Sequence, residues 1–238
     1  MSAPAGGDFG RFDRRSLWWQ VLLVYVSLEG ALWTAGVVQG FFIILTVALT
    51  IVWTFAERHP WPDLGLNPAA IRRAWWIAPV GAVIAGLILL AAWHWHTFRA
   101  PAGTLVVCVN VVLSLIWAFA QQFLAQSFFF LHFEDLLRSG RRAVLATALL
   151  FSSAHIPNPV LVPVTLVGGL ILSEVFRRNR TLYPLAVAHA LVALSLAISV
   201  PETVLHDMRV GIGYIYYQPK SSVSGNQLAP RGEYRRPF

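Results

Sequence analysis

The chain has 238 residues, of which 57% are hydrophobic and only 12% are charged, and its formal net charge is +7. A soluble domain carries about 25% charged residues, so this composition excludes an ordinary soluble protein and predicts one integral membrane domain with short tails. The basic residues stand in short stretches between apolar runs rather than along one basic face, so we expect no nucleic-acid partner.

Seven apolar segments are candidates for membrane-spanning helices, because a helix that crosses the hydrocarbon core needs about 20 apolar residues. The first two could form one hairpin that is broken at Gly36, and the fourth is long enough to leave the membrane before its end. Pro157 and Pro159 end the short fifth segment. The predicted spans are 17–33, 35–56, 74–95, 104–133, 143–156, 160–176 and 182–200.

Arginine-rich stretches alternate with arginine-poor ones along the chain. They lie before the first predicted span and after the second, fourth and sixth, whereas the intervening ends carry only Arg99 before the C-terminal region, which is itself basic. Because such stretches tend to stay in the cytoplasm, the pattern predicts an all-α polytopic transmembrane bundle of about seven spans in the cytoplasmic (inner) membrane, with a cytoplasmic N-terminal tail at 1–16. The membrane domain would cover 17–200. A further crossing or a re-entrant piece near the C-terminus would reverse the side of that end.

Two segments follow the last predicted span. Residues 201–220 include glycines and tyrosines that are typical of an ordered interfacial turn, with the tyrosine hydroxyls in the headgroup region. Residues 221–238 are rich in Ser, Gly, Asn, Pro and Arg and show no apolar period, so we expect a disordered basic tail.

Polar side chains at membrane depth are the most informative feature of the chain, because they are costly in lipid and usually mark a functional site. The fourth span carries Gln121, Gln122 and Gln126, and the last two, four residues apart, share one helix face. Gln121 and His155 both lie about 18 Å from the same side of the membrane, so contact between them is plausible. His189 lies about 10 Å deep, and tilt must absorb the mismatch.

Several kinds of chemistry are open to two imidazoles in a hydrated pocket: they could position a water, donate to an oxyanion or bind a metal. Catalytic zinc usually takes three protein ligands, and Asn158, Glu174 and Glu29 have no telling spacing as a third, so we expect no metal and no cofactor. Glu174 stands close to Arg177 and should pair with a cation, whereas Glu29 could face the cavity. A purely structural role, with cross-helix hydrogen bonds of about 0.6 kcal/mol each, also fits the residues.

Three short motifs from residue 113 to residue 199 resemble those of the CPBP family, the CAAX-processing and bacteriocin-processing intramembrane proteases also called Abi proteins. The stretch 121–126 reads Gln-Gln-Phe-Leu-Ala-Gln where that family has Glu-Glu-x-x-x-Arg. Phe151 and His155 match its Phe-x-x-x-His. His189, followed at the fourth place by Ala193, stands where the family has His-x-x-x-Asn or Asp.

The resemblance implies amide hydrolysis near the C-terminus of a membrane-anchored or lipidated protein, with that protein and membrane lipids as the partners. In the family the leading glutamate activates water, and the histidines and the asparagine orient that water and stabilise the oxyanion. Carried over by position, the catalytic candidates are His155, His189 and Gln121. The residues expected to line the cavity are Gln122, Gln126, Phe151, Asn158 and Ala193.

The departures from the family pattern leave two hypotheses open. A carboxamide cannot act as a general base, and the loss of a positioned base typically costs about 10²–10⁴-fold in rate. Replacing Glu and Arg together by two glutamines removes both charges, which indicates a maintained neutral site with His155 or His189 as the remaining base. Alternatively, the chain is a non-enzymatic scaffold or pseudoprotease that binds a lipid tail or a partner's transmembrane segment. A transporter is disfavoured because no inverted repeat is apparent.

Overall fold

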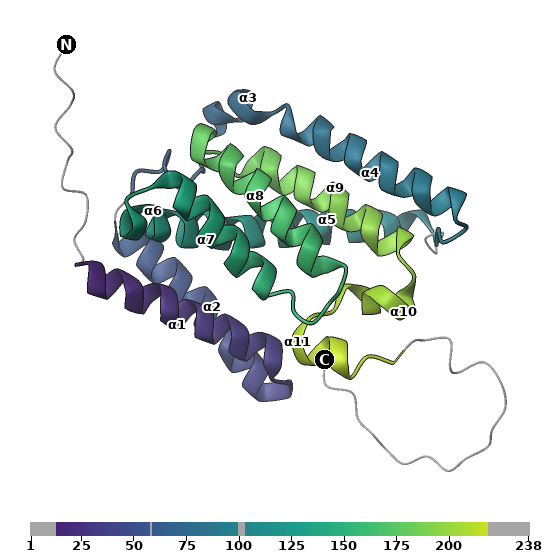
Figure 1. Cartoon of the computed structure of the whole chain (residues 1–238), viewed down its shortest axis with the longest axis horizontal. Helices are drawn as coiled ribbons and strands as arrows, with labels where there is room; N and C mark the ends of the chain where they lie inside the picture. Colours follow the sequence, from purple (N-terminus) through teal and green to yellow (C-terminus); the bar gives the residue numbers. More distant parts are fainter. Residues whose placement is uncertain (1–12, 58, 100–102, 219–238) are drawn as a thin grey trace.

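The computed structural model describes residues 13–57, 59–99 and 103–218, and the regular structure in these ranges is entirely helical (Figure 1). The predicted basic tail, Arg58 and most of the N-terminal tail lie outside the described residues. The elements are α1 (Arg14–Trp33), α2 (Gly36–Ala56), the 3₁₀ turn η1 (Pro68–Ala70), α3 (Ile71–Ala74), α4 (Ile77–His94), α5 (Thr104–Gln122), the π-helix η2 (Phe123–Phe130), α6 (Leu131–Leu137), α7 (Gly140–Ser153), α8 (Leu161–Asn179), α9 (Tyr183–Ser199), α10 (Glu202–Leu205), the 3₁₀ turn η3 (His206–Met208) and α11 (Gly211–Ile215).

Each of the seven predicted spans coincides with a helix, and the chain is an integral membrane protein. Within the described ranges, three helices are long and apolar enough to cross a membrane, namely α2, α4 and the continuous helix Thr104–Leu137. The pair formed by α9 and Glu202–Met208, bent by 119°, would be a fourth. Helix α7 has 14 residues and is therefore only about 21 Å long, less than the core of a bilayer. Seven crossings and a cytoplasmic N-terminus remain predictions.

Small residues let the helices that carry the site approach each other closely. A Cβ added at Gly81 of α4 would stand 2.8 Å from Cα of Ala188 in α9. A Cβ added at Gly169 of α8 would stand 3.0 Å from Cα of Ala148 in α7. Such contacts between backbones are a usual source of helix association in lipid, where the hydrophobic effect does not act between helices.

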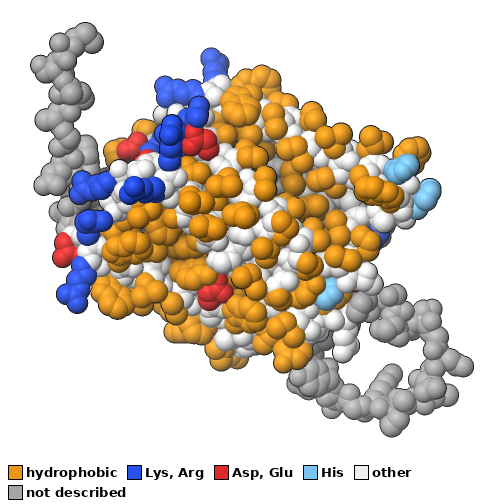
Figure 2. Space-filling view, viewed as in Figure 1, with side chains coloured by type: hydrophobic (Ala, Val, Ile, Leu, Met, Phe, Trp, Pro, Cys, Tyr) orange, Lys and Arg blue, Asp and Glu red, His pale blue; other side chains and the backbone are white. Residues whose placement is uncertain are grey.

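The surface of the bundle has the polarity of a membrane protein. Hydrophobic side chains cover most of the face in Figure 2, whereas arginines gather at one end of it and histidines lie toward the other end. Many of the apolar side chains on the helices are exposed, for example Phe41, Leu87 and Trp117. This distribution fits a helical body in contact with acyl chains and a basic end in contact with headgroups and water.

Candidate active site

A hydrogen-bonded row of amides connects α5 and η2 to α9. Gln122 Nε2 donates to Nδ1 of His189 over 3.1 Å, and Gln126 Nε2 donates to Oε1 of Gln122 over 3.3 Å. Gln126 Nε2 also lies 3.1 Å from Oγ of Ser173 in α8. Both glutamines are 1% exposed, so this row is shielded from solvent and lipid alike. It ties three helices together with neutral groups only.

The helix that supplies the glutamines changes its winding at the site. Helix α5 ends at Gln122, and the following eight residues, Phe123–Phe130, form the π-helix η2. A π segment is uncommon and is found frequently at functional sites, because the wider turn re-aims the side chains on either side of it. Here the change of winding falls between Gln122 and Gln126, the two residues whose side chains meet.

The second imidazole is held from its own helix. His155 follows the end of α7, and its Nδ1 donates to the carbonyl oxygen of Phe151 over 2.7 Å. The Phe151 ring lies edge-on to both histidines, with ring centroids 4.9 Å from His155 and 6.0 Å from His189. The two imidazole centroids are therefore at most about 11 Å apart. Both imidazoles therefore pack against the same ring.

These hydrogen bonds give the two histidines opposite roles. A carbonyl oxygen can only accept, so His155 carries its proton on Nδ1 and leaves a lone pair on Nε2. An amide nitrogen can only donate, so His189 accepts at Nδ1 and carries its proton on Nε2. The free nitrogen is thus a proton acceptor on His155 and a donor on His189.

Both histidines line a large and mostly apolar cavity of about 980 Å³. Ligand pockets typically have about 300–1,000 Å³, so this cavity can hold a sizeable apolar group. Its wall comes from α1, α2, α4, α5, η2, α7, α8 and α9, and from Met208 and Val210 in the segment after α9. Five of the residues expected from the sequence take part in it, and these are Gln121, Phe151, His155, His189 and Ala193.

The structure separates Gln121 from the other two glutamines. Gln121 lines the cavity, and its side chain makes no hydrogen bond within the described part of the chain. Gln122 and Gln126 are not among the cavity-lining residues; they lie behind the wall, where they hold His189. The sequence led us to expect all three in the cavity, but the helix turns only one of them toward it.

Three other candidates lie elsewhere. Asn158 is fully buried but does not line the cavity; its oxygen accepts from the amides of Val160 and Leu161 at the start of α8. Glu29 accepts a hydrogen bond from Trp33 and is likewise not a cavity residue. Glu174 pairs with the neighbouring arginines Arg177 and Arg178, as expected. The described residues contain no group of three or more His, Cys, Asp or Glu that could hold a metal.

The comparison with known families agrees with the motifs. Residues 107–195 match the family model described as type II CAAX prenyl endopeptidase Rce1-like. This match agrees with the resemblance of the three motifs to the CPBP family. It covers most of the stretch 113–199 that carries the motifs, including both histidines and the three glutamines. No curated protein and no solved structure is significantly similar to the chain.

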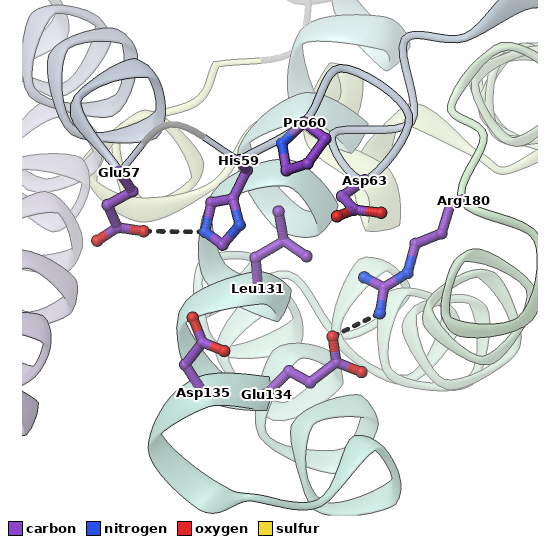
Figure 3. A pocket seen from close by; sticks show the side chains of 8 residues that line it. All are labelled: Glu57, His59, Pro60, Asp63, Leu131, Glu134, Asp135 and Arg180. Carbon is purple, nitrogen blue, oxygen red and sulfur yellow. Dashed lines mark hydrogen bonds and ion pairs between the residues drawn. The ribbon is translucent and has the colours of Figure 1, made fainter. Parts of the chain in front are cut away.

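A second polar cluster lies outside the matched segment's motifs, at the arginine-rich end, and its residues are not among those expected from the sequence. Glu57 lies just after α2 and contacts two histidines. Its Oε2 is 3.1 Å from Nε2 of His59, and its Oε1 is 3.1 Å from Nε2 of His132 in α6. His132 Nε2 is also 2.9 Å from Oε1 of Gln20 in α1. Figure 3 shows Glu57 directed at His59, and Arg180 directed at Glu134 across the same hollow of about 200 Å³.

The electrostatics of this second cluster stabilise the ionised carboxylate. Burial acts to raise the pKa of Glu57, but hydrogen bonds from His132 and His59 lower it from 4.5 to about 2. The hydrogen bond to Glu57 raises the pKa of His59 against the opposing effect of burial. The cluster joins α1 and α6 to the residues that follow α2. One signal could have found it: His132 is an ionisable residue inside the apolar run 128–133.

Proposed function

We propose that the protein is a CAAX-type endopeptidase of the cytoplasmic membrane that hydrolyses a peptide bond near the C-terminus of a prenylated, membrane-anchored protein. The observation that carries the proposal is the pair of complementary histidines on the wall of the apolar cavity. One presents a proton acceptor and the other a donor, and Phe151 holds them at most about 11 Å apart. The apolar cavity offers room for the prenyl chain.

In the proposed reaction His155 replaces the missing glutamate as general base. Its Nε2 accepts a proton from a water molecule, and the water oxygen attacks the scissile carbonyl carbon. The developing oxyanion accepts a hydrogen bond from Nε2–H of His189. The tetrahedral intermediate then expels the amine, which takes up the proton from Nε2 of His155, so that one water and one amide yield a carboxylic acid and an amine.

The glutamines have two different tasks in this proposal. Gln122, which is itself bonded to Gln126, holds Nδ1 of His189 and leaves Nε2–H of His189 to donate into the cavity. Gln121, whose amide has no partner among the described residues, binds the peptide backbone of the substrate. Ala193, one turn after His189, leaves space where the family has an oxyanion donor, so His189 carries that task alone.

Hydrolysis of a fluorogenic farnesyl-cysteine peptide by the full chain in lipid nanodiscs tests the proposal. We expect His155→Ala and His189→Ala each to lower kcat by about 10²-fold or more, which is the usual contribution of a general base or an oxyanion donor. The matched control is His94→Ala, an exposed histidine at the end of α4 that should leave the rate unchanged.

A second variant separates the enzyme from a non-enzymatic scaffold. Gln121→Glu puts a carboxylate at the family's position for the base, directly on the cavity. An increase in kcat that survives in the His155→Ala background would show that the carboxylate takes over the role of His155. If the wild type does not cleave, and only Gln121→Glu does, the native chain is a binding protein with an intact scaffold and the proposed activity is refuted.

A further inference from the structure

The C-terminal segment 201–218, beyond the residues that match the family, forms part of the cavity wall. Met208 and Val210 line the cavity together with residues of the membrane helices. Figure 1 shows α10 and α11 at the end of the bundle near the start of α8, away from the start of α1. An element outside the matched residues 107–195 therefore contributes to the cavity wall.

The backbone at this wall adopts an unusual conformation. Three consecutive residues other than glycine, His206, Asp207 and Met208, have φ values of 49°, 56° and 62°. The left-handed region is unfavourable for residues that carry a Cβ, and three in succession require compensation from the surroundings. The result of this conformation is to place the Met208 side chain at the cavity.

Asn158, two residues after Ile156, supplies that compensation. This role explains why its polar side chain is fully buried. Its Nδ2 donates to the carbonyl of Leu205 over 2.9 Å and to the carbonyl of Arg209 over 3.0 Å. One amide group thus clamps both ends of the left-handed turn. The connection between α7 and α8, which carries Asn158, holds the segment at a second point. There the N–H of Gly211 donates to the carbonyl of Ile156 over 2.8 Å.

Gly211 also fixes the segment against α1. Its φ is +54°, and an added Cβ would stand within 2.1 Å of the carbonyl oxygen of Leu32, so no other residue fits there without a shift. On the other side, Arg99 forms an ion pair with Glu202 across 3.7 Å. The segment is therefore built into the fold at several points rather than resting on its surface.

We propose that the turn His206–Val210 is an end wall of the cavity and that Met208 sets the longest linear hydrocarbon chain the cavity admits. This inference rests on the proposed function for the identity of the chain, an isoprenoid on a cysteine. The apolar lining and the position within a membrane protein select a hydrocarbon occupant. Each buried methylene is worth about fourfold in Kd, so affinity rises with chain length until the chain meets Met208 and then stops rising.

Binding to the full chain in detergent tests this length limit, with S-geranyl, S-farnesyl and S-geranylgeranyl cysteine as probes and lauric and palmitic acid as free-chain probes. Met208→Ala should lower the Kd of the chains just beyond the wild-type limit about fourfold per additional buried methylene. Met208→Trp should move the limit to shorter chains. The matched control, Ile215→Ala, removes an exposed apolar side chain of the same segment and should change nothing.

A third variant tests the clamp. Asn158→Asp keeps the acceptor for the amides of α8 but removes both donors to the turn, so the sharp limit should become gradual. Opposite shifts in the Ala and Trp variants cannot come from misfolding. If both keep the wild-type length dependence, or if no probe binds, the inference is overturned. Because binding is measured without hydrolysis, a length limit in a chain that cleaves nothing would sink the proposed function and leave this inference intact.

Discussion

Opposite charges introduced at the buried positions of Gln122 and Gln126 should be strongly coupled in their effect on stability. The native chain carries no charge at either position. The family pattern has a glutamate and an arginine at these positions. Gln126→Arg places an unpaired cation at a site that is 1% exposed, which should lower the free energy of unfolding by about 3–5 kcal/mol. Gln122→Glu should be milder, since the carboxylate would lie about 3 Å from His189, which can take up a proton.

The double variant Gln122→Glu/Gln126→Arg should recover most of the loss. The two side chains are 3.3 Å apart in the native chain, and opposite unit charges at that distance attract by about 5 kcal/mol at an effective dielectric constant of about 20. A double-mutant cycle should therefore give a coupling energy of at least about 3 kcal/mol. Denaturant unfolding in a mild detergent measures all four proteins, and Gln126→Met serves as the uncharged control.

A weak coupling would contradict this reasoning. If Gln126→Arg is tolerated, or if the double variant loses as much stability as the two single variants together, the pair is not a neutral replacement for an ion pair. The two glutamines would then be a local feature of η2, unrelated to the charges that the family carries there.

Two further predictions concern packing and pH. Gly81→Ala should destabilise the contact of α4 with Ala188 markedly, whereas Gly86→Ala, with nothing within 4 Å, should be neutral or slightly stabilising, as thermal unfolding can show. The free energy of unfolding should be greatest between about pH 4.5 and 6.5. The stabilising contribution of Glu57 is lost as the pH falls toward its pKa of about 2, and that of His59 is lost as the pH rises through its raised pKa. Glu57→Gln should remove the loss of stability above about pH 6.5. If that loss persists in the variant, groups other than His59 cause it.

The sequence predicted the helices well because their signal is local. A run of apolar residues that ends at Pro157 or at Arg177 marks a helix in lipid whatever it packs against. The same holds for the spacing between Phe151 and His155. Residues four apart are one helical turn apart, so the imidazole of His155 meets the carbonyl oxygen of Phe151. The pairing of Glu174 with its neighbours followed for the same reason.

The contacts between distant segments could not be predicted in this way. Whether Gln121 or Gln122 meets His189 depends on the rotation of α5 at the point where η2 widens the helix, and no pattern in the sequence indicates that change. Asn158 looked like a cavity residue because it stands close to His155, yet its partners are backbone carbonyls about fifty residues further along the chain. The contact of Glu57 with His132 likewise depends on how α2 and α6 meet.

The orientation of the bundle provides the last prediction. Arginines gather at one end of the face in Figure 2 and histidines lie toward the other, so the arginine-rich end should face the cytoplasm. Cys108 is the single cysteine of the chain, and Cys108→Ala gives a background for labelling. In that background, Ser139→Cys tests the loop before α7 and His94→Cys tests the end of α4.

A membrane-impermeant maleimide applied to intact cells should label His94→Cys and leave Ser139→Cys unlabelled until the membrane is permeabilised. The reason is that Ser139 lies between Arg138 and Arg141, and moving such a cluster across the membrane is strongly unfavourable. The reverse pattern would invert the bundle and turn the predicted cytoplasmic end outward.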